Sequence, residues 1–356
     1  SVAALVALPE DAGAAYKPYL KLEQRFPGLF AEYLQRRLLG ESPTEVPTSV
    51  FASELASVDV EATRTYSVDA TVTSADIASY ANDHAAFIAT ADIAPLTRGL
   101  RDERGTFSGA RVLGATEIRS VGDLSLASAW NLADPQWLAG GKPGTLTVRA
   151  GGSLAISESI GLPDNNLLAG ESWSLRLTAG ADLLAANPMA TRSDLSGDLK
   201  LETAGAKLRT GTGRIDLAAA GDISIDNVAA TIYTGGRLGV TDTSNRPASE
   251  EEPELRYDRW AVDGGSISMR AGGSIVGAVT EAGDLWVNEW LRRPRQPNNQ
   301  FEELQPTDWW SHRARFQQGV GTLAGGDIDI AAGDSISNLA AMLPTSGRTY
   351  RAADGA

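Results

Sequence analysis

Residues 213–225 read GRIDLAAAGDISI, and this stretch contains one short pattern twice. Each copy has a glycine, a polar residue and then two aliphatic residues separated by one position, as in Gly213-Arg214-Ile215-Asp216-Leu217 and Gly221-Asp222-Ile223-Ser224-Ile225. Alternate side chains of a strand point to the same side, so this spacing predicts short strands with one buried face. The glycine and the aspartate favour a tight turn between the strands.

The same pattern recurs from about residue 111 onwards. Further copies begin at Gly122, Gly144, Gly152, Gly197, Gly265 and Gly326. A strand of about five residues cannot bury its apolar face alone, so a regular series of such strands predicts coils that stack on one another. We therefore expect an all-β fold, a parallel β-helix over 111–281 that continues over 318–347. Connections between parallel strands are nearly always right-handed, which predicts a right-handed solenoid.

Two other interpretations of the repeat are open. A β-sandwich or an up-and-down barrel also combines short strands with glycine turns, although the uniform Ala-Gly joints and the lack of Asn-Gly hairpin signals disfavour both. The Gly-Asp pairs could bind calcium, but calcium-binding β-helices require a Gly-Gly-x-Gly-x-Asp-x period that this chain lacks. Turn chemistry is the simpler explanation of these pairs.

The segments around the repeat have different patterns. Residues 1–47 have helical spacing and are expected to cap or decorate the solenoid, residues 48–110 mix strand and helix patterns, and 348–356 form a tail. Thr73 and Asp76 predict a capping box at the start of a short helix. His84 lies on the apolar stripe of that helix, so we expect it to be packed rather than to bind a ligand.

Composition excludes several classes of function. The 356 residues include 31 Lys and Arg against 45 Asp and Glu, for a net charge of −14. Such a chain repels nucleic acid and anionic lipid, and it has no apolar stretch of membrane-spanning length, so neither a nucleic-acid partner nor membrane insertion is expected. The absence of cysteine excludes disulfide bonds and thiolate metal sites. We expect no metal and no cofactor.

A segment at 282–317 interrupts the repeat and is rich in tryptophan and arginine. Its candidate ligand-binding residues are Trp286, Trp290, Arg292, Arg293, Trp309, Trp310, His312 and Arg313. Flat aromatic faces and guanidinium donors suit an acidic sugar or a protein partner. The alternative is a cap in which the tryptophans pack onto the solenoid and the arginines extend over them.

Parallel β-helices also include polysaccharide hydrolases and lyases, so a catalytic role is an alternative. Glycoside hydrolysis needs two carboxylates roughly 5–9.5 Å apart. Stacking could bring Asp216, Asp222 and Asp226 together, but the first two occupy repeat positions that hold Thr, Ser or Lys elsewhere. We therefore expect ordinary surface residues and no enzyme.

Several stretches resemble large exoproteins of the filamentous-haemagglutinin family, in the expected order. They are ATEIRSVGDLSL (115–126), PGTLTVRAGG (143–152), SWSLRLTAGADL (172–183), TGTGRIDL (210–217), IYTGGR (232–237) and FQQGVG (316–321). The resemblance implies secretion through an outer-membrane partner protein, a right-handed parallel β-helix, and a role in adhesion, aggregation or biofilm formation. It also implies a location outside the cell or on its surface.

The chain lacks the signal peptide and the N-terminal secretion domain of a complete member of that family, which suggests an internal or near-C-terminal segment. We expect a rigid stalk or presentation scaffold of an adhesin whose receptor is a glycan or protein on a host or bacterial surface. The alternatives are a β-helical polysaccharide-active enzyme and a glycan-binding module that acts through the segment 282–317.

Overall fold

The computed structural model describes residues 50–51, 58–90, 100–102, 105–106, 110–138, 142–163, 170–194, 196–241, 259–279, 291–292, 310–311, 316, 319–344 and 348–349. Contacts divide the chain into two compact units, Ser1–Ala62 with Ala91–Leu113 and Thr63–Thr90 with Gly114–Ala356. The segment 1–47, predicted to be helical, lies outside the described residues. The first unit contains a small sheet in which β1 (Val50–Phe51) pairs in parallel with β4 (Leu100–Asp102), and β4 pairs antiparallel with β5 (Gly105–Thr106).

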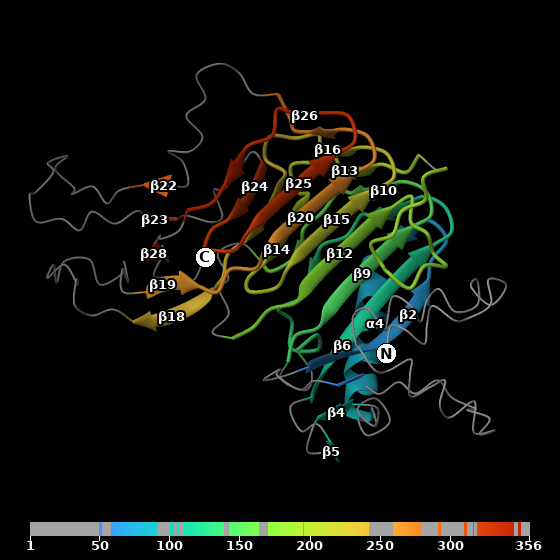
Figure 1. The fold of residues 1–356 in the computed structure, drawn as a ribbon, viewed down its shortest axis with the longest axis vertical. Helices are drawn as coiled ribbons and strands as arrows, with labels where there is room; N and C mark the ends of the chain where they lie inside the picture. The colour runs from blue at the N-terminus through green and yellow to red at the C-terminus, as the bar shows by residue number, and fades with distance from the viewer. Residues whose placement is uncertain are drawn as a thin grey trace, which may run out of the picture. The chain divides into compact units, whose positions relative to one another are not determined.

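Three long sheets lie mainly in the second unit, although β2 and β6 begin at residues assigned to the first (Figure 1). Sheet 1 contains, in spatial order, β2 (Val58–Ser67), β6 (Ala110–Ser120), β9 (Thr145–Ala150), β12 (Ser174–Ala179), β15 (Ile215–Ala219), β20 (Ile267–Ala271) and β25 (Ile328–Ala332). Sheet 2 contains β3 (Thr71–Val72), β7 (Leu124–Leu126), β10 (Leu154–Ile156), β13 (Leu199–Leu201), β16 (Ile223–Ile225), β21 (Ile275–Val276) and β26 (Ile336–Ser337). Sheet 3 contains β8 (Trp130–Asn131), β11 (Ile160–Gly161), β14 (Lys207–Thr210), β17 (Thr231–Thr234), β24 (Gly319–Thr322) and β27 (Ala341–Met342).

The chain passes from sheet 1 to sheet 2 to sheet 3 and then returns to sheet 1 one strand further along. The coil β9–β10–β11 is followed in this way by β12–β13–β14, and each strand of the first coil pairs in parallel with its counterpart in the second. Such a succession is the right-handed parallel β-helix predicted from the sequence. The first strands of the stack, β2 and β3, precede residue 111, where the repeat becomes visible in the sequence.

The aliphatic residues of the repeat stack in register and form the core. In sheet 1, Leu177 pairs with Val148 on one side and with Leu217 on the other, and Leu217 pairs with Met269. These four side chains are at most 1% exposed. Full burial of one such side chain contributes roughly 1.5–3 kcal/mol, so each coil is stabilised chiefly by the coils above and below it.

The aspartates of the Gly-Asp turns connect successive coils. Oδ1 of Asp123 accepts a hydrogen bond from the backbone N–H of Ser153 in the next coil, at 2.7 Å. Asp198 accepts one from the N–H of Asp222 at 3.0 Å, and Asp222 accepts one from the N–H of Ser274 at 2.6 Å. Each carboxylate therefore satisfies a backbone donor of the following coil.

Gly152, Gly221 and Gly273 leave room for an aspartate carboxylate of the preceding coil. A Cβ atom on Gly152 would lie 2.2 Å from Oδ1 of Asp123, and one on Gly221 would lie 2.2 Å from Oδ1 of Asp198. No larger residue fits there without displacing the aspartate. Glycine at these turn positions is thus explained by contact between coils as well as by turn geometry.

The helix α4 (Ser74–Thr90) begins with the predicted capping box. Oγ1 of Thr73 accepts a hydrogen bond from the N–H of Asp76 at 3.3 Å, and Oδ2 of Asp76 accepts one from the N–H of Thr73 at 2.9 Å. The helix follows β3, at the point in the chain where later coils have their sheet 3 strand. Tyr80 packs 6.3 Å from the ring of Trp130 in β8, so α4 covers part of the core next to the first strand of sheet 3.

His84 of α4 is packed, as expected from the sequence. It is 1% exposed, and its ring lies 5.3 Å from that of Trp137 and 5.1 Å from that of Trp173. Nδ1 lies 3.4 Å from Oγ1 of Thr116. Burial lowers the pKa of His84 below its ordinary value, although the neighbouring Asp83 acts in the opposite direction.

The long interruptions of the repeat fall in turns between sheets. A fourth group of strands contains β18 (Arg237–Thr241), β19 (Arg259–Val262), β28 (Arg348–Thr349), β23 (Trp310–Ser311) and β22 (Leu291–Arg292). Of these, β18 and β19 lie between β17 and β20 in the chain, whereas β22 and β23 lie between β21 and β24. Apart from residues 291–292, 310–311 and 316, the predicted Trp/Arg-rich segment 282–317 lies outside the described residues.

Candidate functional site

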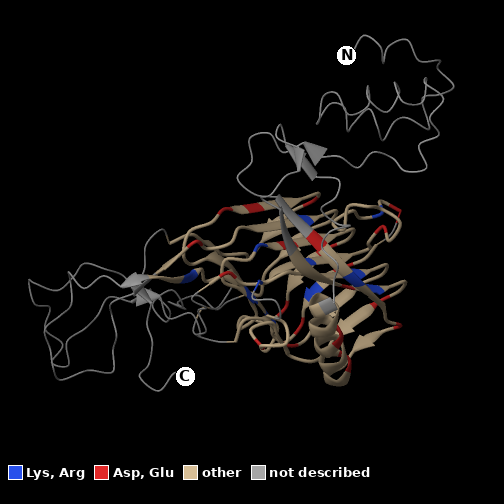
Figure 2. Cartoon of the chain, turned by 90° about the horizontal axis from the view of Figure 1, so that it is seen from below, with Lys and Arg blue, Asp and Glu red and all other residues tan. Residues whose placement is uncertain are grey.

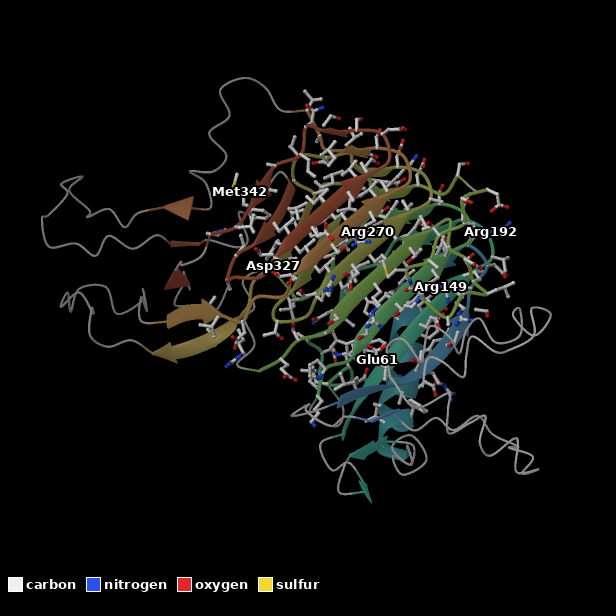
Figure 3. All side chains as sticks on the ribbon, in the orientation of Figure 1. Glu61, Arg149, Arg192, Arg270, Asp327 and Met342 are labelled. Atoms are coloured by element: carbon white, nitrogen blue, oxygen red, sulfur yellow. The ribbon has the colours of Figure 1, made fainter. Side chains whose placement is uncertain are left out.

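The outward side chains of sheet 1 form two columns across the coils. The first column contains Glu117, Thr147, Arg176, Asp216, Ser268 and Asp329, and the second contains Arg119, Arg149, Thr178, Ala218, Arg270 and Ala331. Lys and Arg are interspersed with Asp and Glu over the described strands (Figure 2). Figure 3 places Arg149 and Arg270 over the strands of this sheet. The face is therefore polar and carries both signs of charge.

Arg149 is a buried cation on this face, with a side chain that is 2% exposed. Its Nη1 atom donates to Oε1 of Glu117 at 3.2 Å, and the same carboxylate accepts two hydrogen bonds from Arg119, at 2.7 and 2.8 Å. Burial raises the pKa of Glu117, but the hydrogen bonds from Arg119 and Arg149 outweigh burial and hold that pKa below its usual value. The carboxylate is thus ionised at neutral pH.

Arg149 also holds the loop between β12 and β13 against the sheet. Its Nη2 atom donates to the backbone carbonyls of Asp182 and Ala185. Oγ1 of Thr178, the next outward residue of the column, donates to the carbonyl of Pro188 at 2.9 Å. A backbone bridge between Ala181 and Thr191 closes the base of the loop. These bonds fix the loop to the outer face of sheet 1.

A groove with a volume of about 540 Å³ lies between this loop and the neighbouring coils. The loop contributes Asn187, Met189 and Thr191 to its lining. The other side of the lining comes from β15 and β20 and the residues next to them: Arg214, Asp216, Leu217, Ala218, Ala219, Ser268, Arg270, Ala271 and Gly272. The groove is open to solvent and crosses two successive coils.

The two arginines of the groove are each paired with an aspartate but keep other donors. Nε of Arg214 lies 2.5 Å from Oδ1 of Asp216, and Nη2 of Arg270 lies 3.0 Å from Oδ2 of Asp329. Their side chains are 56% and 69% exposed. Each guanidinium carries five N–H donors, so several remain available to a ligand.

The structure describes little of the site predicted in the segment 282–317. The backbones of Arg292 and Trp310 are partners in the antiparallel pairing of β22 with β23. The other predicted ligand-binding residues lie outside the described residues: Trp286, Trp290, Arg293, Trp309, His312 and Arg313.

The three aspartates considered as a catalytic cluster occupy different parts of a coil. Asp216 is on the outer face of sheet 1 and bonded to Arg214, whereas Asp222 lies in the turn before β16 and accepts the N–H of Ser274. Asp226 follows β16 and begins the turn towards sheet 3. A carboxylate pair for hydrolysis is not assembled from these residues.

The groove and its loop were not predicted, although the sequence contains a signal for the loop. Gly151 and Gly152 join β9 directly to β10, whereas the equivalent glycines after β12 are Gly180 and Gly197. A Cβ atom on Gly197 would lie 2.6 Å from Cα of Gly180, so these two residues still meet and form one turn. Residues 181–196 are therefore an insertion within a repeat turn, and the glycines on either side of it indicate this.

Within the described segments, no α-helix combines the length and the apolar character needed to cross a bilayer. No three His, Cys, Asp or Glu residues of the described ranges are grouped as a metal ion requires. Comparisons with known protein families, with curated proteins and with solved structures gave no match to this chain.

Proposed function

We propose that this chain is a section of a secreted, surface-exposed bacterial adhesin, in which the β-helix is a rigid scaffold that presents the segments inserted in its turns. One observation supports the proposal above others: long insertions leave the strands on either side in register. Ile223 pairs with Ile275 across the insertion between β17 and β20, and Ile232 pairs with Val320 although residues 235–318 separate β17 from β24. Turns that accept such insertions can carry binding loops without loss of the core.

The use of side chains within the stack also favours a mechanical role. Aliphatic ladders fill the interior. The aspartates of the turns accept hydrogen bonds from backbone N–H groups of the next coil, so their role is structural. Each coil is bound to its neighbours by many small contacts at once, so bending or extension would disrupt several of them together. A stiff rod of this kind suits a stalk.

The resemblance to filamentous-haemagglutinin exoproteins supports the cellular setting of this proposal. It favours secretion of the parent protein through an outer-membrane partner, and a receptor that is a glycan or a protein on a host or bacterial surface. The low content of large aromatic residues, 6%, and the frequent glycines are typical of a thin layered solenoid of this type.

Surface location is the first property to test. Antibodies raised against the purified chain should label intact cells of the organism that makes it, or detect the protein in the culture medium, while a cytosolic marker stays unlabelled. Deletion of the gene should reduce adhesion or aggregation of the cells. Detection of the protein only inside lysed cells would overturn the proposal.

The presentation role has its own test. Replacement of residues 282–315 by a short Gly-Ser linker in the full protein, which keeps the buried Phe316, should leave the β-sheet circular dichroism spectrum unchanged and reduce adhesion of the cells. Replacement of residues 242–258, in the insertion between β17 and β20, by a linker of the same kind is the matched control. Loss of the folded β-helix after either replacement would contradict a scaffold that tolerates insertions.

A polysaccharide-active enzyme is a second candidate because the groove on sheet 1 is open and polar. Hydrolysis requires two carboxylates, and Asp216 is the one carboxylate in the groove lining, with Oδ1 bonded to Arg214. The lining therefore suits binding better than hydrolysis. Release of reducing ends or unsaturated products from acidic polysaccharides, lost in Asp216→Asn, would favour the enzyme over the scaffold.

A further inference from the structure

The floor of the groove on sheet 1 is made by small outward residues at two adjacent coils. Ala218 on β15 lies between Thr178 and Arg270 in its column, and Ser268 on β20 lies between Asp216 and Asp329. Both are nearly buried, at 5% and 6% exposed. Because these side chains are short, a hollow remains between the larger groups on either side, and both residues line it.

The groove presents more hydrogen-bond donors than acceptors. Arg214 uses Nε for Asp216, and among the described residues neither of its terminal nitrogens has a hydrogen-bond partner. Arg270 uses Nη2 for Asp329 and keeps Nε and Nη1. Ser268 and Thr191 contribute hydroxyl groups to the lining. These groups converge on one open hollow from two coils and from the loop.

The loop that forms one wall is held in place by hydrogen bonds to sheet 1. Arg149 binds two of its carbonyls, and Thr178 binds a third at 2.9 Å. Oδ1 of Asn187 accepts the N–H of Met189 at 3.0 Å, which fixes the turn at the groove's edge. A ligand that enters the groove therefore pays little to order the wall, and preorganisation of this kind favours binding.

We propose that this groove binds an acidic oligosaccharide. A carboxylate or sulfate group of the sugar would accept paired hydrogen bonds from Arg214 or Arg270, whose planar guanidinium groups suit such bidentate recognition. Ring hydroxyls would bond to Ser268, Thr191 and the free Oδ2 atom of Asp216. The inference goes beyond the scaffold role and does not depend on it, since a stalk needs no groove.

The geometry favours a sugar over an acidic peptide. Peptides commonly bind to a sheet through an exposed strand edge or through apolar anchor pockets. The groove instead lies over the face of sheet 1, where β15 is paired with β12 on one side and β20 on the other, so no strand edge is exposed. Met189 is the one large apolar side chain that the loop adds to the lining. The groove therefore suits a ligand whose hydroxyl and acidic groups are recognised by side chains, as those of an acidic sugar would be.

The test is a binding titration of the full chain with a galacturonic acid tetrasaccharide and with a heparin tetrasaccharide, which separate carboxylate from sulfate recognition. Maltotetraose is the neutral control, and a tetraglutamate peptide tests the peptide alternative. The double variant Arg214→Gln/Arg270→Gln should weaken binding of the preferred acidic sugar at least about tenfold, because each substitution removes a charge-assisted hydrogen bond to the sugar.

A matched double variant removes the same charge elsewhere. Arg192 and Arg237 are each ion-paired with an aspartate outside the groove lining, at 2.5 and 2.6 Å, so Arg192→Gln/Arg237→Gln should change binding less than about twofold. Thr191→Trp, at an exposed position of the loop, should fill the groove without a change of charge and abolish binding. Thermal unfolding of all variants checks that they fold.

Three outcomes would overturn the inference. They are the absence of binding of either acidic sugar to the wild-type chain, equal weakening by the two double variants, and binding of maltotetraose as strong as that of the acidic sugars. Stronger binding of tetraglutamate, dependent on Arg214 and Arg270, would replace the sugar by an acidic peptide. The scaffold role is tested by surface labelling, so its failure is distinguishable from failure of the groove.

Discussion

Oδ1 of Asp222 lies 2.2 Å from the point that a Cβ atom on Gly273 would occupy in the next coil. The same oxygen atom accepts a hydrogen bond from the N–H of Ser274 at 2.6 Å. The carboxylate of Asp222 therefore occupies the space that a side chain at position 273 of the next coil would need. It explains why the coil after Asp222 has glycine at position 273.

Gly273→Ala should destabilise the protein by about 1–3 kcal/mol, because the added methyl group must displace the Asp222 carboxylate or the backbone. Chemical denaturation measures the change. The matched control is Gly122→Ala in the first Gly-Asp turn, where a Cβ atom would meet nothing within 4 Å. That variant should differ from the wild type by no more than about 0.5 kcal/mol.

A double variant separates this clash from a general cost of alanine. Asp222→Ala loses the bond to Ser274, but in the Gly273→Ala background it also removes the clash. The two changes together should therefore cost less than the sum of the single changes, by about 0.5–3 kcal/mol. Simple additivity would show that the two side chains do not compete for the same space.

The aliphatic ladders should dominate stability. Leu177→Ala removes a side chain with 0% exposure from the middle of sheet 1 and should cost about 2–5 kcal/mol. Ile336, in the last coil, is 51% exposed, so Ile336→Ala should cost less than about 1 kcal/mol. Equal effects of the two changes, measured by denaturant titration, would contradict a continuous buried ladder.

The buried Arg149 should be needed for the loop that forms the groove wall. Arg149→Met leaves the carbonyls of Asp182 and Ala185 without their donor and should destabilise the fold by about 3 kcal/mol. Hydrogen exchange at residues 181–194 should become faster. Arg119→Met removes a partner of the same Glu117 carboxylate from a side chain that is 39% exposed, and should cost less than about 1 kcal/mol. Unchanged hydrogen exchange of residues 181–194 in Arg149→Met would show that Arg149 does not hold the loop in place.

His84 should make stability depend on pH. Its pKa in the folded protein is below the ordinary value of 6.5, so below pH 6.5 the unfolded chain binds more protons than the folded one. Stability should therefore fall as the pH decreases below about 6.5, and it should do so less steeply in His84→Gln. The chain has 2 His, so His312→Gln is the control and should retain the wild-type slope. Identical slopes in all three proteins would show that His84 does not contribute.

The fold was predictable because it depends on a short local pattern that recurs. Ile215, Leu217, Ile223 and Ile225 indicate the strand spacing and the buried face, and they are 0–2% exposed. Thr73 and Asp76 likewise predicted the start of α4 through contacts between residues three positions apart. Both features are encoded within a few residues of sequence.

The groove was not predictable in the same way, because it depends on register between coils. Arg214 and Arg270 are far apart in the sequence and line one hollow only because β15 and β20 are adjacent in sheet 1. The bonds from Arg149 to the loop after β12 likewise connect successive coils across 33 and 36 positions. Nothing in the local sequence around Arg149 distinguishes it from the other outward residues of the sheet.

Spin-label distances along sheet 2 can establish whether the coils stack in parallel and in register. The chain has no cysteine, so Thr71→Cys can be labelled together with Ser224→Cys, Val276→Cys or Ser337→Cys. The pairing of β3 with β7 and onwards to β26 places these partners four, five and six strand steps from Thr71. At about 4.8 Å per step, the Cα separations should be about 19, 24 and 29 Å. Double electron–electron resonance should give three narrow distributions that increase in this order, whereas distances that do not increase along the series would contradict the parallel β-helix.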